Sequence, residues 1–557
     1  MPSILDRGKP QTGLHISILG FGIYRILRKC RSSYPSAAII SSSVILCFSY
    51  MSGFAVPAKR AIVMYLCMMG AQVLGRTYDA THGLALAIII LLIQNPLALK
   101  QSGFLFSFTA MLSIILYGIL FPAPRWEEKE DSKSKITWQM LLYDKIVSPL
   151  KKSCLFNLWL QVWLMPLTAW FYYEVPMYSL FLNLLVLPFS SWLLTGGAIA
   201  ALIYKWVPGV AGWILVGCHI ILDLYETGIN EIGKIPGNLL LTGKPEIICM
   251  LIYYFFLAVF CCWKWLHQSK KYPRHKILFC IIWGCLLSGT LLVHPKELPG
   301  IYMLDVGQGD GLFLTDGAGT HVWIDGGSSS ESSVGTYRML PFLKYHRVAE
   351  IDIWIVTHPD EDHVSGLKEL LQRGYPVHQL FLAKAQKNQE TCQKLAVLAK
   401  KNGTDIQYVK AGDQLQLTDM NLTCLYPQKE EMETDINGLS QVWELHSHGF
   451  GMLFTGDLGE MQENLLDKRG LLHKVNVLKV GHHGSRYSSS ENFLARLQPE
   501  TALISSSAKN RYHHPSAETL KRLENQGCVI YCTKDVGQIA IRYKKNYWYI
   551  ENFTDSD

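Results

Sequence analysis

Histidine and aspartate residues lie close together in one short stretch of the chain. His358, Asp360, Asp362 and His363 fall within six residues, and imidazole and carboxylate groups are common protein ligands of divalent cations. A solvated acidic turn with two surface histidines is the competing interpretation. The spacing favours a site for one or two cations.

More residues of these types follow much later in the chain, each after an apolar run. Asp457 comes after Phe454-Thr455-Gly456, and His482 and His483 come after the run 477–481. Three such sets in order are hard to obtain by chance. We therefore expect them to contribute to the same metal site.

Strands are needed to position these groups. The apolar run 351–356 predicts a buried strand that ends just before the first set, and a helix is expected to begin near Val364. Residues 301–327 alternate β-rich runs with glycine turns, and Asp305 and Asp325 close two of those runs. The ligand-type residues therefore stand at strand ends, where a site can form.

The composition divides the chain into two halves of different character. Of its 557 residues, 49% are hydrophobic and only 17% are charged, whereas soluble domains carry about 25% charged residues. Apolar runs fill residues 1–295, and residues 296–557 are mixed and charged. This excludes a disordered tail, a collagen-like fibre and a small disulfide scaffold, and the net charge of +7 by itself does not indicate DNA.

Runs of about 20 apolar residues are needed to cross a bilayer. We expect up to ten such spans in the first half, with eight or nine as an alternative, near residues 13–27, 37–56, 60–76, 80–98, 103–121, 154–172, 177–204, 209–232, 247–265 and 277–295. The first half is therefore predicted to be a multi-span membrane domain.

Cationic loops indicate the orientation, because Lys and Arg are enriched on the cytoplasmic side. Five cations precede the last predicted span: Lys264, Lys270, Lys271, Arg274 and Lys276. If they are inside, the last helix leaves the cytoplasm. The C-terminal half is thus expected to be extracytoplasmic.

The motif order HxDxDH, GD and HHGS resembles the metallo-β-lactamase fold, a four-layer αββα sandwich. The resemblance implies two divalent metal ions held by six residues: His358 and Asp360 on one metal, Asp362, His363 and His482 on the other, and Asp457 bridging both.

Two departures from that family concern the metal. Asp360 stands where many members have histidine, and the usual histidine between the HxDxDH and GD motifs is absent, with 437–440 in the corresponding region. Oxygen donors favour harder ions, so Mn²⁺ rivals Zn²⁺.

The whole chain resembles the ComEC family of DNA-uptake channels. The resemblance rests on a polytopic region followed by five motifs: DVGQGD at 305–310, HPDEDH at 358–363, LFTGDL at 453–458, VGHHGS at 480–485 and HHPSAETLKRL at 513–523. Members usually carry further N-terminal helices and an OB-like domain, and only about a dozen residues precede the first matching stretch at 13–15. We therefore expect a truncated, fragmentary or divergent short member.

The resemblance implies DNA uptake across the cytoplasmic membrane during transformation. One strand would be translocated through the lipid-embedded half, and the outer half would act as a metal-dependent, deoxyribonuclease-like hydrolase. Asp362 would orient the attacking water, Lys479 would hold a phosphate and His514 would protonate the leaving oxygen. For Lys479 and His514, a surface or packing role is the alternative.

Partners are expected as separate polypeptides. The sequence contains no P-loop pattern, so a motor ATPase, like a DNA receptor, would be another protein. The sequence leaves open whether the chain forms a homo-oligomer. The alternatives are a membrane-tethered metallohydrolase of a small ester or phosphodiester, and a channel whose metal domain binds DNA without cutting it.

Overall fold

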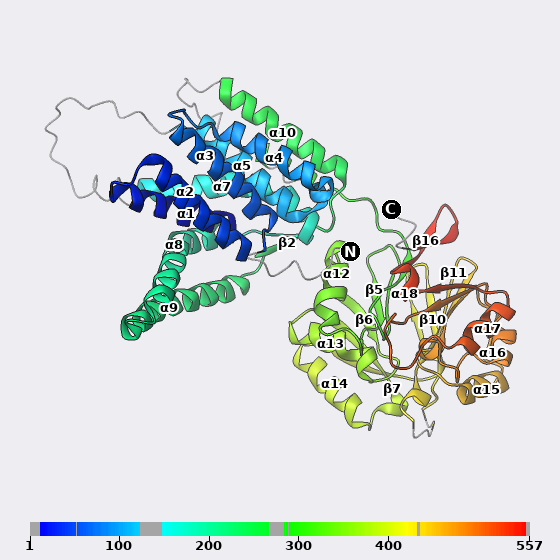
Figure 1. Ribbon diagram of the computed structural model, residues 1–557. Helices are drawn as coiled ribbons and strands as arrows, with labels where there is room; N and C mark the ends of the chain where they lie inside the picture. Colours follow the sequence, from blue (N-terminus) through cyan, green and yellow to red (C-terminus); the bar gives the residue numbers. More distant parts are fainter. Residues whose placement is uncertain are drawn as a thin grey trace. The chain divides into compact units, whose positions relative to one another are not determined.

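The computed structural model consists of two compact units, Met1–Val293 and His294–Asp557 (Figure 1). The predicted boundary after residue 295 lies beside this division, and the functions assigned to the two halves stay predictions. The structure describes residues 12–51, 53–122, 147–266, 283–284, 286–287, 289–429, 431 and 435–552.

The N-terminal unit is helical. Its longer described helices are α1 (Thr12–Lys29), α2 (Tyr34–Met51), α3 (Val56–Val73), α4 (Ala80–Gln94), α5 (Ser102–Leu120), α7 (Ser148–Tyr172), α8 (Ser179–Ile203), α9 (Pro208–Gly233) and α10 (Ile247–Leu266). They coincide with the first nine predicted spans. Most of the tenth, near 277–295, and the cations at 270–276 lie outside the described residues.

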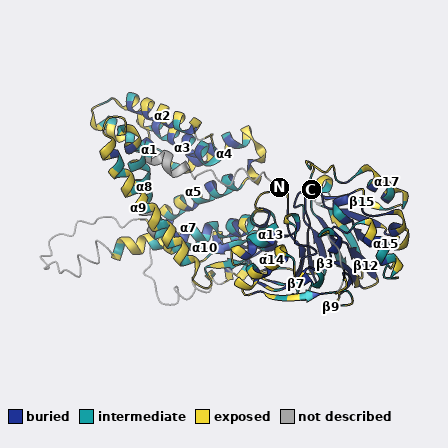
Figure 2. Cartoon of the chain, turned by 90° about the horizontal axis from the view of Figure 1, so that it is seen from below, coloured by how far each residue is buried: buried dark blue, intermediate teal, exposed yellow. Residues whose placement is uncertain are grey.

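Lipid-compatible surfaces distinguish this unit from a soluble bundle. Among the described residues, five helices are long and apolar enough to cross a membrane: α2, α5, α7, α9 and α10. Large apolar side chains remain exposed on them and their neighbours, with Trp213 79% and Trp192 71% exposed, and Figure 2 shows this exposure along α8 and α9. Helices apolar on all sides are typical of membrane spans.

Short contacts connect the helices of this unit. The strands β1 (Glu174–Pro176) and β2 (Leu239–Leu241) pair antiparallel. Arg60 on α3 donates from Nε to Ser107 Oγ on α5 over 2.7 Å. Polar groups inside such bundles are satisfied by neighbouring helices in this way.

The C-terminal unit contains two large sheets. The first has the order β17-β16-β3-β4-β5-β6-β7-β8, formed by β3 (Gly300–Met303), β4 (Gly311–Thr315), β5 (His321–Asp325), β6 (Ile351–Ile355), β7 (Val377–Ala383), β8 (Asp405–Val409), β16 (Ile539–Lys544) and β17 (Tyr547–Asn552).

The second sheet has the order β15-β14-β13-β12-β11-β10-β9. Its strands are β9 (Gln414–Gln416), β10 (Asn421–Tyr426), β11 (Val442–Ser447), β12 (Phe450–Phe454), β13 (Val477–Lys479), β14 (Thr501–Ile504) and β15 (Val529–Cys532). In the first sheet, neighbouring strands from β5 through β8 pair in parallel. In the second sheet, neighbouring strands from β12 through β15 do the same.

Alternating side chains give the central strands two buried faces, as expected for strands covered on both sides. Trp323 and Trp354 pack under the helices α12 (Leu340–Tyr345), α13 (Glu361–Gln372) and α14 (Glu390–Lys401). Ile324 and Ile355 instead face the second sheet and pack with Trp443.

The second sheet is covered in the same manner. Leu453 and Leu478 pack under α15 (Glu460–Lys468), α16 (Glu491–Leu497) and α17 (Ala517–Asn525), and Figure 2 shows the strands buried beneath helices with exposed outer faces. Three apolar layers thus separate helix, sheet, sheet and helix, which confirms the predicted αββα sandwich.

Candidate metal centre

The ligand-type residues follow parallel strands of both sheets. His358 comes shortly after β6, and Asp362 and His363 lie in the first turn of α13, where the helix dipole favours carboxylates. Asp457 follows β12, and the two-histidine turn η7 (Gly481–Gly484) follows β13. The carboxyl ends of these strands therefore meet at one edge of the sandwich.

Asp457 lies at the centre of the group, with its side chain only 4% exposed. Its carboxylate oxygens lie 3.3 Å from His363 Nε2, 3.7 Å from His483 Nε2, 3.8 Å from His482 Nε2 and 4.0 Å from His358 Nε2. A single carboxylate facing four imidazoles has the arrangement expected of a bridging metal ligand.

Four residues form the tightest cluster. Asp362, His363, Asp457 and His483 each offer one ligand atom, and these atoms all lie within 4.8 Å of one another. His483 Nε2 is 3.5 Å from Asp362 Oδ2. Two imidazoles and two carboxylates at this separation suit a divalent cation.

His358 gives a direct indication that the residues fit a metal. Its Nδ1 lies 3.1 Å from Thr357 Oγ1 and 3.3 Å from Ser440 Oγ, contacts that orient the ring. Among the described residues its Nε2 is buried without a hydrogen-bond partner, since Asp360 and Asp457 are 3.9 and 4.0 Å away. A nitrogen oriented by outer partners and left open inward is typical of a metal ligand.

The electrostatics of the cluster favour added positive charge. Burial alone would lower the pKa of His363, but the carboxylates of Asp457 and Asp325 outweigh burial and raise this pKa well above its ordinary value. Burial opposes ionisation of Asp457, yet His363 and His483 hold its pKa well below the usual range. A divalent cation would supply the same compensation.

Buried residues behind the cluster contact the candidate ligands and their neighbours. Asp325 Oδ2 lies 3.0 Å from His363 Nδ1, and Asp325 Oδ1 accepts the Thr357 N–H over 2.8 Å. The buried carboxylate of Asp310 pairs with the ammonium group of Lys479. Such outer contacts fix the ring orientation of metal-ligating histidines.

Two sequence-family models match the chain. One, described as Competence protein, matches residues 12–267, and the other, described as Beta-lactamase superfamily domain, matches residues 320–489. In both parts the chain is similar to the ComEC-type competence proteins. Together with the five apolar helices among the described residues, this similarity indicates a multi-pass membrane protein.

Curated ComEC-type relatives cover almost the whole chain. ComE operon protein 3 of Bacillus subtilis (strain 168) is 26% identical over 96% of this chain and 67% of its own length. Recombination protein 2 of Haemophilus influenzae is 24% identical over the same shares, and competence protein ComA of Neisseria gonorrhoeae is 23% identical over 93% and 67%. The chain thus spans about two thirds of the length of these relatives.

Solved structures with some likeness include the metallo-beta-lactamase fold protein YhfI from Bacillus subtilis. It is 11% identical, covers 45% of this chain and 100% of its own, and has a TM-score of 0.31. The sheet topology and the family model, rather than this low score, establish the fold of the C-terminal unit.

All six predicted ligands lie at the same edge of the sandwich: His358, Asp360, Asp362, His363, Asp457 and His482. Their distribution between two metals stays a prediction. His482 lies at the rim, with a side chain 35% exposed, and it is not part of the tightest cluster.

His483 is among the residues expected at the metal site but not among the six predicted ligands, and its side chain is only 2% exposed and belongs to the tightest cluster. Both adjacent histidines have left-handed backbones, with φ of 49° at His482 and 55° at His483. The paired histidines were the only available signal, because side-chain direction in this turn depends on the fold.

Two predicted substrate-contacting residues are placed differently from each other. Lys479 is 1% exposed and pairs with Asp310, so its ammonium group is committed to a buried carboxylate instead of facing a substrate phosphate. His514 lies at the rim, with its ring centre 5.8 Å from that of His482, and burial lowers the pKa of His514 to about 4.

Ser440 occupies the region where many members of the family have a metal-binding histidine. Its hydroxyl oxygen lies 3.3 Å from His358 Nδ1 and accepts the Asp457 N–H over 3.3 Å. A residue that departs from the family pattern thus contacts two predicted ligands.

Proposed function

We propose that this chain transports DNA across the cytoplasmic membrane during transformation, and that its C-terminal unit hydrolyses DNA phosphodiester bonds with two divalent ions, Mn²⁺ or Zn²⁺. The Asp457 carboxylate, within 4.0 Å of four imidazole nitrogens, carries the hydrolase proposal. The match of residues 12–267 to the Competence protein model, and the printed names of the competence relatives, support the transport proposal.

The proposed chemistry is hydrolytic. Bound divalent cations lower the pKa of a water molecule and polarise a phosphate oxygen. Asp362, whose side chain is 25% exposed, is the proposed residue that orients the attacking water. It is suited to this because its pKa is about 2: burial would raise the pKa, and the nearby imidazoles of His483 and His363 together outweigh burial.

His514 is the proposed proton donor to the leaving oxygen. Its pKa of about 4 leaves the ring neutral at pH 7, and a neighbouring phosphate anion would raise that pKa and favour the protonated form. For Lys479 we propose a positioning role through Asp310 in place of direct phosphate contact.

A metal-dependent cleavage assay on the purified full chain tests the hydrolase. Single- and double-stranded DNA would be incubated with Mn²⁺ or Zn²⁺ and with wild type, Asp362→Ala or Asp405→Ala. Asp405 is exposed on β8, so its variant is the matched control. We expect Asp362→Ala to lower cleavage at least about a hundredfold and Asp405→Ala to cleave like wild type.

Other results of the same assay would contradict the hydrolase proposal. A folded, metal-loaded chain that retains DNA without cutting it would contradict the hydrolase proposal and favour a DNA-binding channel. Cleavage of small phosphodiesters but not DNA would favour the tethered metallohydrolase. Loss of transformation in a host lacking this chain, restored by wild type, tests the transport role separately.

A further inference from the structure

The loop between β14 and α17, residues 505–516, borders the metal centre. Its Ser516 N–H donates to the Gly484 carbonyl oxygen at the end of η7 over 2.8 Å. The ring centre of His514, in the same loop, lies 5.8 Å from that of His482. Side chains of this loop therefore stand next to the predicted metal ligands.

Tyr512 presents an aromatic ring to solvent beside His514. The two rings stack with their centres 5.7 Å apart and an angle of 14° between their planes, yet Tyr512 is 68% exposed. One face of the tyrosine ring is thus turned to the proposed proton donor, and most of the ring stays free. A ring exposed in this way stabilises the fold little, because it buries little apolar area.

The loop holds Tyr512 in a defined position. The Asn510 side chain donates from Nδ2 to the carbonyl oxygens of Ser507 and His514 over 2.7 and 2.8 Å, and Asn510 Oδ1 accepts the His514 N–H over 2.8 Å. Three hydrogen bonds of one side chain therefore close the loop on both sides of Tyr512. A ring that is fixed before a ligand arrives binds it at a lower entropic cost.

Apart from histidine, the charged residues of this loop and of the neighbouring segment 485–490 are all cationic: Lys509, Arg511 and Arg486. All three residues are exposed. Cationic groups beside an exposed aromatic ring are typical of surfaces that bind single-stranded nucleic acids, in which the cations contact phosphates and the ring stacks on a base.

We propose that Tyr512 is a stacking platform for an unpaired base of a DNA strand at the metal centre, and that Arg511 and Arg486 contact the phosphates of this strand. The inference rests on the proposed hydrolysis of DNA, and it names single-stranded DNA as the substrate of that site. The bases of a duplex are stacked between their neighbours, so their faces are not available to Tyr512.

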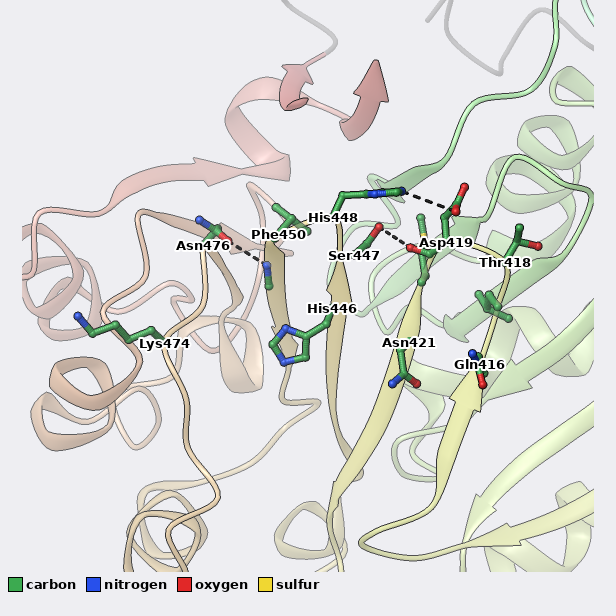
Figure 3. A pocket seen from close by; sticks show the side chains of 14 residues that line it. Gln416, Thr418, Asp419, Asn421, His446, Ser447, His448, Phe450, Lys474 and Asn476 are labelled. Atoms are coloured by element: carbon green, nitrogen blue, oxygen red, sulfur yellow. Dashed lines mark hydrogen bonds and ion pairs between the residues drawn. The ribbon is translucent and has the colours of Figure 1, made fainter. Parts of the chain in front are cut away.

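A groove elsewhere in the C-terminal unit supplies a control. Figure 3 shows Lys474 and His446 at this groove of about 530 Å³. His446 pairs with Gly451 near the start of β12, whereas Asp457 follows the last residue of that strand. Lys474 is therefore an exposed cation away from the metal centre, and Tyr547, 56% exposed on β17, is an exposed tyrosine outside the proposed platform.

Cleavage kinetics of the purified full chain test the platform. Wild type, Tyr512→Ala, Tyr512→Phe and the control Tyr547→Ala would be assayed with Mn²⁺ or Zn²⁺ on a single strand and on the same strand with abasic sites. We expect Tyr512→Ala to raise KM for the intact strand at least about fivefold, Tyr512→Phe to restore most of this loss, and Tyr547→Ala to match wild type. Abasic sites should remove the difference between wild type and Tyr512→Ala, because the base and the ring act as one pair.

Salt dependence of strand binding tests the phosphate contact. Arg511→Ala should reduce the slope of log affinity against log salt concentration by about 0.7, the value for one phosphate contact to a single strand. Lys474→Ala should leave the slope unchanged. Equal slopes for wild type and Arg511→Ala would contradict this contact.

A photochemical measurement does not need hydrolysis. A strand carrying 5-iododeoxyuridine would be irradiated on the full chain, and the attached residue would be mapped by mass spectrometry. A cross-link at Tyr512 and none at Tyr547 supports the platform, and absence of a cross-link at Tyr512 overturns it.

The two proposals can fail separately. If wild type cuts single strands and Tyr512→Ala does so with the same KM, the platform is wrong and the hydrolase proposal stands. If wild type cuts no DNA, the hydrolase proposal is wrong, and the cross-link decides the platform.

Discussion

At the residue scale, the adjacent His482 and His483 differ strongly in exposure. Burial places His483 against Asp457 and Asp362, and its Nδ1 is 3.2 Å from the Ser505 carbonyl oxygen. His482 stays at the rim, with its Nε2 3.8 Å from Asp457 Oδ2. We infer that the two contribute unequally to metal retention.

His483→Ala is therefore expected to weaken metal binding more than His482→Ala. Loss of a ligand or of its orienting partner typically lowers metal affinity by about 10–100-fold. Equilibrium dialysis with Mn²⁺ or Zn²⁺ on both variants measures the difference. A larger loss for His482→Ala would show that the rim histidine is the main ligand.

Asp316 provides a prediction about pH. Burial would raise its pKa, but the N–H groups of Thr320 and Ala318 and the hydroxyl of Thr418 lower it to about 2. Because the folded pKa lies below the unfolded one, the stabilisation is present above about pH 4 and lost as pH falls toward 2.

Asp316→Asn should lower the stability of the C-terminal unit by about 1–2 kcal/mol at pH 7, after allowance for solvent screening. The difference from wild type should shrink near pH 3. Hydrogen exchange of residues 311–325 at both pH values measures it, with Asp405→Asn, at an exposed position, as the control. A difference that grows on acidification would contradict this account.

At the scale of elements, two helices hold the loop that follows the two histidines. Glu463 on α15 is 2% exposed, and its carboxylate accepts the N–H groups of Ser489 and Ser490 over 2.5 and 2.9 Å. From α17, Thr519 Oγ1 donates to the Ser485 carbonyl oxygen over 2.7 Å. Two helices thus restrain the segment that positions His483.

Glu463→Gln is expected to loosen this loop, because an amide forms weaker bonds to N–H groups than a carboxylate and brings an unpartnered NH₂ group into the interior. We expect metal affinity to fall about 3–10-fold and hydrogen exchange of residues 485–490 to rise. Glu460→Gln, at an exposed position of the same helix, is the matched control. Unchanged exchange in the Glu463 variant would contradict the restraint.

At the scale of the whole molecule, three groups of cationic residues are separated along the chain by even numbers of helices. Arg28 and Lys29 end α1, and helices α2 to α5 lie between them and Lys151 and Lys152 on α7. Helices α7 to α10 then lead to Lys264. If each helix crosses the membrane once, all three groups lie on the same, cytoplasmic side.

This parity predicts an extracytoplasmic C-terminal unit, since one further span near 277–295 would follow Lys264. Alkaline phosphatase fused after residue 557 should be active, and the green fluorescent protein at the same position should not fluoresce. The matched fusions after Lys264 should give the reverse pattern. Fluorescence of the C-terminal fusion would place the metal centre in the cytoplasm.

Local sequence patterns were sufficient to predict the membrane half and the group of candidate ligands, whereas the αββα sandwich was predicted from the resemblance of the motif order to the metallo-β-lactamase fold. Hydropathy and strand-like runs are local, and ligands that directly follow parallel strands must meet at their carboxyl edge. His358, Asp362 and Asp457 could therefore be chosen without coordinates.

Only the tertiary structure decided which neighbouring groups contact one another. Lys479 pairs with Asp310 across 169 positions of the chain, and Asp325 supports His363 from a different strand. Sequence spacing has no information about such contacts, because they depend on how strands from two sheets pack. The same packing buries His483 and leaves His482 at the rim, a distinction that two adjacent identical residues cannot reveal.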